Sequence, residues 1–284
     1  MDLELANMRQ KFATSSSLTS YQKKKYVWKM CYIFMLGYEI DFGHLEFIAL
    51  LGSSKYTEKS VGYMAVSMFL RPGDEMMSLV INSMRNDIIG HLSFGKTLAL
   101  AAVSNLGGND LAEALSPEVQ RLISTPLDNG STYMLSPNAE AERYEKASIC
   151  KKAMLCLLRL FRTNPECVEL ESWVRNLARI LEDRDLGVVT SGMSLLLGFA
   201  SFSPATFEPL VPYVVSILTR LVVERQCSAD YFYYRTASPW LQCKCLRFLQ
   251  YYKAPDKGTQ QGKEIIKYSL VFLLFLKYFE IFFI

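Results

Sequence analysis

Residues 90–97 read GHLSFGKT and fit the spacing GxxxxGK[ST] of a phosphate-binding loop. In such a loop, backbone amides and Lys96 surround the phosphates, while the Thr97 hydroxyl reaches magnesium. The loop works only where a buried strand leads into it, and the upstream apolar residues instead recur at helical spacing. A P-loop nucleotide-binding protein is therefore kept as an alternative function. The preferred interpretation is that Gly90 ends one helix and Ser93 caps the next, with Lys96 in solvent.

A second group of reactive side chains lies in SYQKKKYVWK, residues 20–29, which holds three consecutive lysines. A helix with 3.6 residues per turn divides this segment into an apolar face and a polar face. The predicted core stripe consists of Val27, Met30, Cys31 and Phe34. The predicted solvent face carries Tyr21, Lys25 and Lys29.

Lysines in the first turn of a helix are unfavourable by ~0.3 to 1 kcal/mol each, because the helix N-terminus carries partial positive charge. An incoming phosphate would offset that cost, since free amides and ammonium groups would converge on one anion. Tyr21 or Tyr26 would add a hydroxyl donor. The pattern favours a contact with a phosphoinositide or another acidic lipid. A solvated charge run explains the same residues equally well, so both interpretations stay open.

Composition argues against other chemistry. Seven irregularly spaced cysteines without a CxxC pair, and only two histidines, predict no zinc site and suit a reducing, cytosolic compartment. A net charge of +3 over 284 residues argues against a dedicated nucleic-acid binder. His44 and His91 have no acid or nucleophile at catalytic spacing. We therefore expect neither an enzyme nor a bound cofactor.

The elements that must position these groups are helices. Apolar helical segments end at short Gly, Asn or Pro breaks, spaced roughly 35 to 40 residues apart. These breaks are Gly37 and residues 71–73, 107–108, 163–165 and 203–204. No run alternates as a strand would. The predicted fold class is all-α, a HEAT/armadillo-like alpha-solenoid of stacked antiparallel helix pairs, with an irregular helical bundle as the competing prediction.

Second helices fill the intervals between the breaks, for example at residues 117–124 and 207–225. The stripe predicted for the latter consists of Val214, Ile217, Leu218 and Leu221. Residues 124–143 are rich in Ser, Pro, Asn and Gly and predict a loop insertion. The aromatic residues 227–239 predict an ordered connection.

Eight strings of the sequence resemble one family. They are LANMRQKF, YQKKKYVWK, LGYEIDFGHLE, KYTEKSVGY, ALAAVSNLGG, LCLLRLFR, DLGVVTS and SPWLQCKCLRFLQYY. Together they resemble the N-terminal trunk of the alpha-adaptins, the alpha large subunits of the clathrin endocytic adaptor complex. The resemblance implies a HEAT-like solenoid in a heterotetramer with beta, mu and sigma type subunits. It also implies peripheral attachment to the plasma membrane at clathrin-coated pits, through phosphatidylinositol bisphosphate, with clathrin as an indirect partner.

The resemblance further implies which residues contact the lipid. The basic residue before the Phe of the family's first-helix pattern corresponds to Lys11, which precedes Phe12. The implied phosphoinositide-binding set is Lys11, Tyr21, Lys23, Lys24, Lys25, Tyr26 and Lys29. Because the chain begins within the family's first helix, without the family's basic extension, we expect reduced lipid affinity. Where the family usually has Cys, this chain has Trp28.

The expected domain organisation is an adaptin trunk fragment at residues 1–258 followed by a tail at 259–284 that lies outside the resemblance. The tail ends in the apolar run YSLVFLLFLKYFEIFFI, which approaches the ~20 residues of a membrane span. We interpret it as an artefact of the gene model, and a tail anchor is the alternative. The other alternative function is a generic helical-repeat scaffold that does not bind lipid.

Overall fold

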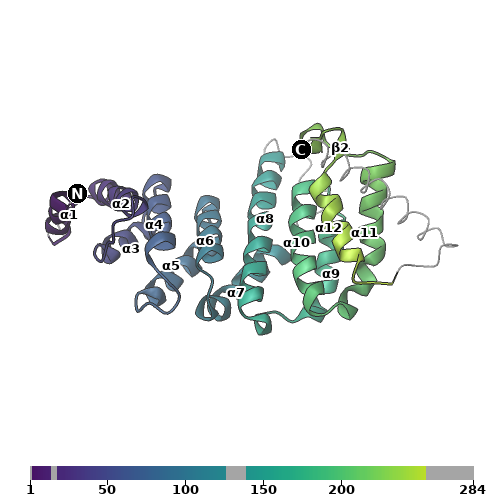
Figure 1. The fold of residues 1–284 in the computed structure, drawn as a ribbon, viewed down its shortest axis with the longest axis horizontal. Coiled ribbons are helices and arrows are strands. Elements are labelled where there is room, and N and C mark those ends of the chain that lie inside the picture. Colours follow the sequence, from purple (N-terminus) through teal and green to yellow (C-terminus); the bar gives the residue numbers. More distant parts are fainter. Residues whose placement is uncertain (1, 14–17, 126–138, 254–284) are drawn as a thin grey trace. The chain divides into compact units, whose positions relative to one another are not determined.

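The computed structural model describes residues 2–13, 18–125 and 139–253 of the chain (Figure 1). Within them, helices joined by short turns account for nearly all of the regular structure, which confirms the all-α prediction. Most of the expected loop insertion and the whole apolar tail at 259–284 lie outside the described residues. The chain divides into two compact units, Met1–Cys167 and Val168–Ile284.

The first unit contains eight α-helices within its described residues. They are α1 (Asp2–Ala13), α2 (Ser20–Met35), α3 (His44–Leu51), α4 (Tyr56–Phe69), α5 (Met77–Ile89), α6 (Ser93–Leu106), α7 (Asn109–Ser124) and α8 (Ala139–Thr163). A short 3₁₀ turn, η3 (Pro165–Cys167), follows.

These helices form two rows. In one row α2, α4, α6 and α8 contact each other in succession, and in the other α3, α5 and α7 do so. The rows are joined where α3 packs on α4, α5 on α6, and α7 on α8. Figure 1 shows the helices of this unit following one another in chain order, from purple to teal. Each pair buries its apolar stripe against the next pair, which is the arrangement of a helical-repeat stack.

The predicted breaks lie where helices end. Gly37 follows the end of α2 with φ 94°, and Gly107 and Gly108 separate α6 from α7 with φ 63° and 112°. Positive φ values favour glycine, which has no Cβ to collide with the preceding carbonyl. At Gly107 a Cβ would also lie only 2.9 Å from the guanidinium of Arg159. The remaining breaks, at residues 71–73, 163–165 and 203–204, lie at the ends of α4, α8 and α10, and each contains a proline.

Two boundaries differ from the prediction. The helix expected at residues 117–124 is the second half of α7, which keeps Pro117 in its interior because one apolar stripe continues through it. That buried stripe consists of Leu111, Leu115 and Val119. Helix α8 begins at Ala139, so residues 139–143 of the expected loop are helical.

The second unit is also helical, with one small ribbon. Its elements are α9 (Leu170–Leu181), α10 (Leu186–Phe202), η4 (Ala205–Leu210), α11 (Val211–Leu218), η5 (Thr219–Val223), η6 (Ala229–Tyr231), β1 (Phe232–Tyr233), β2 (Thr236–Ala237) and α12 (Pro239–Leu249). Helix α10 packs on α9 and α12, and α11 packs on α12. The aromatic connection contains an antiparallel hairpin, with Phe232 opposite Ala237. Strands of two residues are too short to show alternation in the sequence.

The run from Ala205 to Val223 is the one helical segment, among the described residues, that is long and apolar enough to cross a membrane. Its predicted stripe, Val214, Ile217, Leu218 and Leu221, is fully buried. This run packs against α9, α10 and α12 within the second unit. Its apolar face is therefore accounted for by packing within that unit.

Candidate functional site

The GHLSFGKT segment does not form a phosphate-binding loop. Gly90 ends α5, as expected, but helix α5 and not a strand leads into the segment. Lys96 and Thr97 lie inside α6, where the Thr97 hydroxyl donates to the carbonyl of Phe94 at 3.1 Å. Lys96 is half-buried instead of lying free in solvent. The geometry that would place backbone amides around phosphates is therefore missing.

The prediction that Ser93 caps α6 is wrong. Leu92 occupies the N-cap position, and no side chain there accepts a hydrogen bond from the helix. Ser93 is the first helical residue, and its hydroxyl donates to the carboxylate of Glu145 on α8. Ser93 thus lies one residue too far along the chain to act as the N-cap, whose side-chain oxygen would accept a hydrogen bond from the helix.

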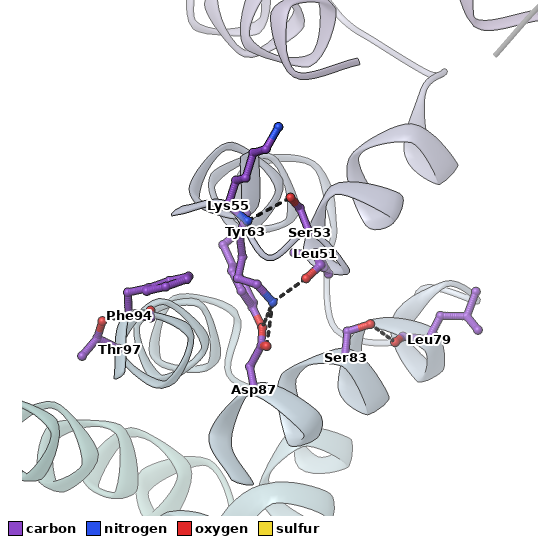
Figure 2. A network of polar contacts seen from close by, with 10 residues as sticks. Leu51, Ser53, Lys55, Tyr63, Leu79, Ser83, Asp87, Phe94 and Thr97 are labelled. Atoms are coloured by element: carbon purple, nitrogen blue, oxygen red, sulfur yellow. Dashed lines mark hydrogen bonds and ion pairs between the residues drawn. The ribbon is translucent and has the colours of Figure 1, made fainter. Parts of the chain in front are cut away.

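A buried polar network lies beside this segment, and no motif in the sequence indicated it. The Lys59 ammonium donates to both oxygens of Asp87, at 2.6 and 2.7 Å, and to the Leu51 carbonyl at 2.6 Å. Tyr63 donates its hydroxyl to the same carboxylate. Figure 2 shows Leu51, Tyr63 and Asp87 converging on one point where α3, α4 and α5 meet. Burial, reinforced by Asp87, raises the pKa of Tyr63 far above its usual range, so this hydroxyl stays protonated.

The network also comes close to Gly95 of this segment. A Cβ on Gly95 would lie 3.5 Å from a carboxylate oxygen of Asp87. That side of α6 therefore faces a carboxylate that is already paired with Lys59.

The lysine run lies on α2, but one turn further along than predicted. Thr19 is the N-cap residue and forms a capping box with Gln22. The backbone N–H of Gln22 donates to the Thr19 hydroxyl oxygen at 3.3 Å. Lys23 therefore begins the second turn, where the field of the helix N-terminus is weaker. Because the backbone N–H of Gln22 is already hydrogen-bonded to Thr19, an anion here would contact mainly side chains. The prediction of lysines in the first turn is wrong for this reason.

The buried face of α2 agrees with the prediction at three positions. Val27, Met30 and Cys31 are buried, whereas Phe34 is 38% exposed and Ile33 is buried in its place. Helix α2 packs on α3 as well as α4, which shifts the buried arc around the helix. The Phe34 ring still contacts Phe69, edge to face, with 5.0 Å between the ring centroids.

The predicted solvent face is confirmed, since Tyr21, Lys25 and Lys29 are all exposed. Lys24 is half-buried at the edge of this face, where its ammonium lies 4.8 Å from the centre of the Tyr21 ring, a cation–π contact. Lys29 forms an ion pair with Glu4 of α1. We call Tyr21, Lys24, Lys25 and Lys29 the basic face of α2.

The other residues of the expected lipid-binding set lie differently. Lys11 is exposed in the last turn of α1. Tyr26 is half-buried, and its ring contacts Phe12 edge to face at 6.0 Å. Lys23 is half-buried and lies about 160° around the helix from Lys25. The structure therefore brings four of the seven expected residues onto one face and separates Lys23 and Tyr26 from it.

The basic face has the chemistry of an anion site. Helix α2 carries four lysines and no acidic residue. Ammonium groups act as point charges toward phosphate, and the Tyr21 hydroxyl is an additional donor. No group of three or more metal-ligating side chains occurs in the part of the chain that the structure describes. All seven cysteines are free thiols, and burial raises the pKa of Cys31 to about 11 and that of Cys156 to about 12.

The first unit is a two-row stack of helices with an exposed basic face, and Lys96 and Thr97 of the phosphate-loop match lie inside a helix. These features define a helical-repeat scaffold. The family described as "Adaptin N terminal region" matches residues 2–270, and the chain belongs to this family of non-enzymatic scaffolds. This finding confirms the resemblance stated from the eight sequence strings.

Curated relatives show the same similarity. The chain is 44% identical over 263 residues to "AP-2 complex subunit alpha-1" of Arabidopsis thaliana, covering 92% of this chain and 24% of that protein. It is 39% identical over 260 residues to "AP-2 complex subunit alpha-2" of Dictyostelium discoideum, with coverages of 92% and 24%. For "AP-2 complex subunit alpha" of Schizosaccharomyces pombe the identity is 35% over 262 residues, with 92% and 28%. The chain thus spans about a quarter of the length of these relatives.

Among solved structures, the fold is similar to a homology model of the full-length AP-3 complex in an intermediate open conformation. The TM-score is 0.55 at 21% sequence identity, and the similarity covers 81% of this chain and 34% of that chain. At this identity the similarity supports the helical-repeat fold alone.

Proposed function

We propose that the chain forms part of the trunk of an adaptor large subunit in clathrin-mediated endocytosis and protein transport. It would act as a peripheral scaffold on the cytoplasmic side of the plasma membrane, at clathrin-coated pits. Support comes from the adaptin family match and from relatives whose names identify them as alpha subunits of AP-2 complexes.

The basic face of α2 carries the lipid-binding part of the proposal. Its lysines would bind the phosphates of phosphatidylinositol bisphosphate, and Lys11 would extend the contact from α1. Each lysine close to an anionic membrane contributes about 1 kcal/mol. The observation that supports this proposal is the placement of Lys25 and Lys29 on one exposed face with Tyr21, with the half-buried Lys24 at its edge, on a helix without acidic residues.

The helical stack would provide the surface for protein partners. We propose that beta, mu and sigma type adaptor subunits bind it in a heterotetramer and that clathrin is contacted indirectly. Nucleic acid is not among the proposed partners, because the net charge of +3 is small for a chain of 284 residues.

Cosedimentation with phosphatidylcholine vesicles, with and without phosphatidylinositol bisphosphate, tests the lipid proposal. Changing Lys23, Lys24, Lys25 and Lys29 together to alanine lowers the net charge by four and should abolish the binding that depends on the phosphoinositide. The charge-matched control changes four exposed basic residues elsewhere to alanine, namely Lys55, Arg71, Arg162 and Arg184. Equal loss in both variants would mean that only net charge matters, and the site would be rejected.

Single substitutions test the geometry of the face. Lys25→Ala should weaken phosphoinositide binding about fivefold, which corresponds to about 1 kcal/mol. Lys23→Ala removes the same charge from the other side of α2 and should have a smaller effect. Equal effects of the two substitutions would favour a diffuse electrostatic attraction over a site on one face. Unchanged sedimentation in every variant would favour the generic scaffold without lipid binding.

A further inference from the structure

The exposed side of α2 carries large apolar side chains as well as lysines. Trp28 is 56% exposed, Tyr32 57% and Met35 65%. At 100° per residue these three positions fall within about 60° of one another, so they form one stripe. We call Trp28, Tyr32 and Met35 the aromatic stripe of α2. Three large side chains in a row on one exposed face are more than the scattered apolar residues of an ordinary surface.

The stripe is surrounded by the lysines of the basic face. Trp28 is four residues after Lys24 and three after Lys25, so its indole neighbours both side chains on the helix surface. Lys29 lies on the far side of Tyr32 in the same arc. From Tyr21 to Met35 this surface extends along the helix for about 21 Å.

We propose that the aromatic stripe inserts into the interfacial zone of an anionic bilayer while the neighbouring lysines contact headgroup phosphates. This proposal rests on the proposed lipid-binding function and deepens it, since it assigns the apolar side chains of the same face to the acyl boundary. Trp and Tyr combine an apolar ring with a polar group and accumulate at membrane–water interfaces. Lysine stems can lie along the boundary while their ammonium groups reach the phosphates.

The charge pattern identifies a bilayer as the occupant. A helix with an apolar stripe, three lysines beside it (Lys24, Lys25 and Lys29) and no acidic residue matches a surface that is negative at the headgroups and apolar just below them. Helix α2 would lie in the plane of the interface, with its buried residues still packed against α3 and α4. A second copy of this chain that paired through the same surface would place lysines against lysines.

The second unit provides an internal comparison. Trp240 is 62% exposed, and its ring centroid lies 5.1 Å from that of Tyr233 in the hairpin region. It is as accessible as Trp28, but the sequence around it, residues 230–244, carries Asp230, Arg235 and Lys244 and no lysine run. The third tryptophan of the chain, Trp173, is buried in the core of that unit.

Fluorescence quenching tests the insertion directly. The full chain carrying Trp240→Phe retains Trp28 as its exposed indole, and the chain carrying Trp28→Phe retains Trp240. Each is mixed with phosphatidylcholine vesicles containing phosphatidylinositol bisphosphate, in which the phosphatidylcholine acyl chains are either brominated or not. Bromine quenches only indoles that reach the acyl region. We expect quenching of the Trp240→Phe protein and none of the Trp28→Phe protein.

Vesicle affinity provides a second readout. Trp28→Ala should weaken sedimentation roughly three- to tenfold, because it removes a large apolar contact with the interface. The loss should persist at high salt, whereas the loss from Lys25→Ala should shrink as salt screens the lysines. Trp240→Ala should leave the affinity unchanged.

The outcomes distinguish insertion of the aromatic stripe from headgroup binding by the lysines alone. Sedimentation that depends on the phosphoinositide, without bromine quenching of Trp28, would overturn insertion and leave headgroup binding in place. Absence of sedimentation would overturn both. A blue shift of Trp28 emission that depends on protein concentration and occurs without vesicles would show that another copy covers the stripe, which also overturns the proposal.

Discussion

At the residue scale, Lys59 shows how the first unit holds a charge in its interior. Its side chain is only 6% exposed, and its ammonium donates to the Asp87 carboxylate and the Leu51 carbonyl. The ion pair joins α4 to α5, and the hydrogen bond to the Leu51 carbonyl also joins Lys59 to the end of α3. Burying an ion pair is weak evidence for net stabilisation, but removing one partner leaves the other charged, buried and without its counter-ion.

Substitution of Lys59 should therefore be costly. Lys59→Met is expected to destabilise the first unit by about 3 to 5 kcal/mol, because Asp87 loses its counter-ion inside the protein. Urea unfolding followed by circular dichroism measures the change. Lys152→Met is the matched control, since Lys152 is exposed on α8, and it should change stability by no more than about 0.5 kcal/mol. Similar midpoints for the two variants would show that the buried pair is not needed.

Buried thiols should make stability depend on pH. The folded-state pKa values of Cys31 and Cys156, about 11 and about 12, exceed the ~8.5 of an unfolded cysteine. The unfolded chain therefore loses these protons first, and the stabilisation present below pH ~8.5 is lost as pH rises toward 11. Each thiol contributes at most ~1.4 kcal/mol per pH unit. Urea midpoints between pH 8 and 10 measure this fall, and Cys156→Ala should make it shallower; an identical slope would contradict the assignment.

At the element scale, the contact between α3 and α4 depends on a glycine. Gly62 lies in the middle of α4, where a Cβ would approach the Phe47 carbonyl oxygen and the Leu50 Cβ to 3.0 Å each. Both atoms are part of or next to the backbone of α3, so neither can move aside easily. The close approach of the two helices explains why α4 has glycine at this position, although glycine weakens a helix by about 1 kcal/mol relative to alanine.

Gly62→Ala should accordingly destabilise the protein, despite the better helix propensity of alanine. Overpacking of this kind costs about 1 to 3 kcal/mol, which exceeds the gain in propensity. Gly52→Ala is the control, because a Cβ there would make only an ordinary 3.6 Å contact with the Ala49 carbonyl oxygen. Thermal unfolding by circular dichroism should show a lower midpoint for Gly62→Ala alone. A midpoint equal to or above that of the unmodified chain would contradict the close packing.

The element scale also shows what the sequence can predict. Helix ends were predictable because Gly and Pro at residues 71–73, 107–108 and 203–204 act locally, through φ and through missing donors. The solvent side of α2 followed from helical periodicity in the same way. Phe34 was wrongly predicted to be buried, because burial depends on how many neighbours a helix has. Helical periodicity carries no information about the number of neighbours. The Lys59–Asp87 pair was missed because its partners are 28 residues apart and meet only through packing.

The basic face was predicted only in part, for a similar reason. Counting residues along α2 placed Tyr21, Lys25 and Lys29 together, because their mutual angles depend on the helix alone. The capping box between Thr19 and Gln22 sets where the helix begins, and it moved the lysine run into the second turn. Thr followed three residues later by Gln was the available signal for that start.

At the scale of the whole molecule, the proposed assembly and the proposed membrane binding can be tested separately. The basic face belongs to one exposed side of α2, whereas α2 itself is held by its contacts with α3 and α4. A partner that binds only the folded chain must raise its stability, whichever surface it uses. Changes confined to exposed lysines should then affect vesicle binding without affecting assembly.

We expect the chain to co-purify with beta, mu and sigma type adaptor subunits when all four are coexpressed, and to unfold at a higher temperature in the complex. A partner present at about 100 times its dissociation constant adds about 2.7 kcal/mol, which for a chain of this size raises the midpoint by about 5 °C or more. Size-exclusion chromatography and thermal scans measure both effects. The Lys25→Ala/Lys29→Ala variant should assemble and gain stability equally while binding vesicles poorly. Separate elution of the subunits, with the chain still binding phosphoinositide vesicles, would reject the heterotetramer and keep the lipid site.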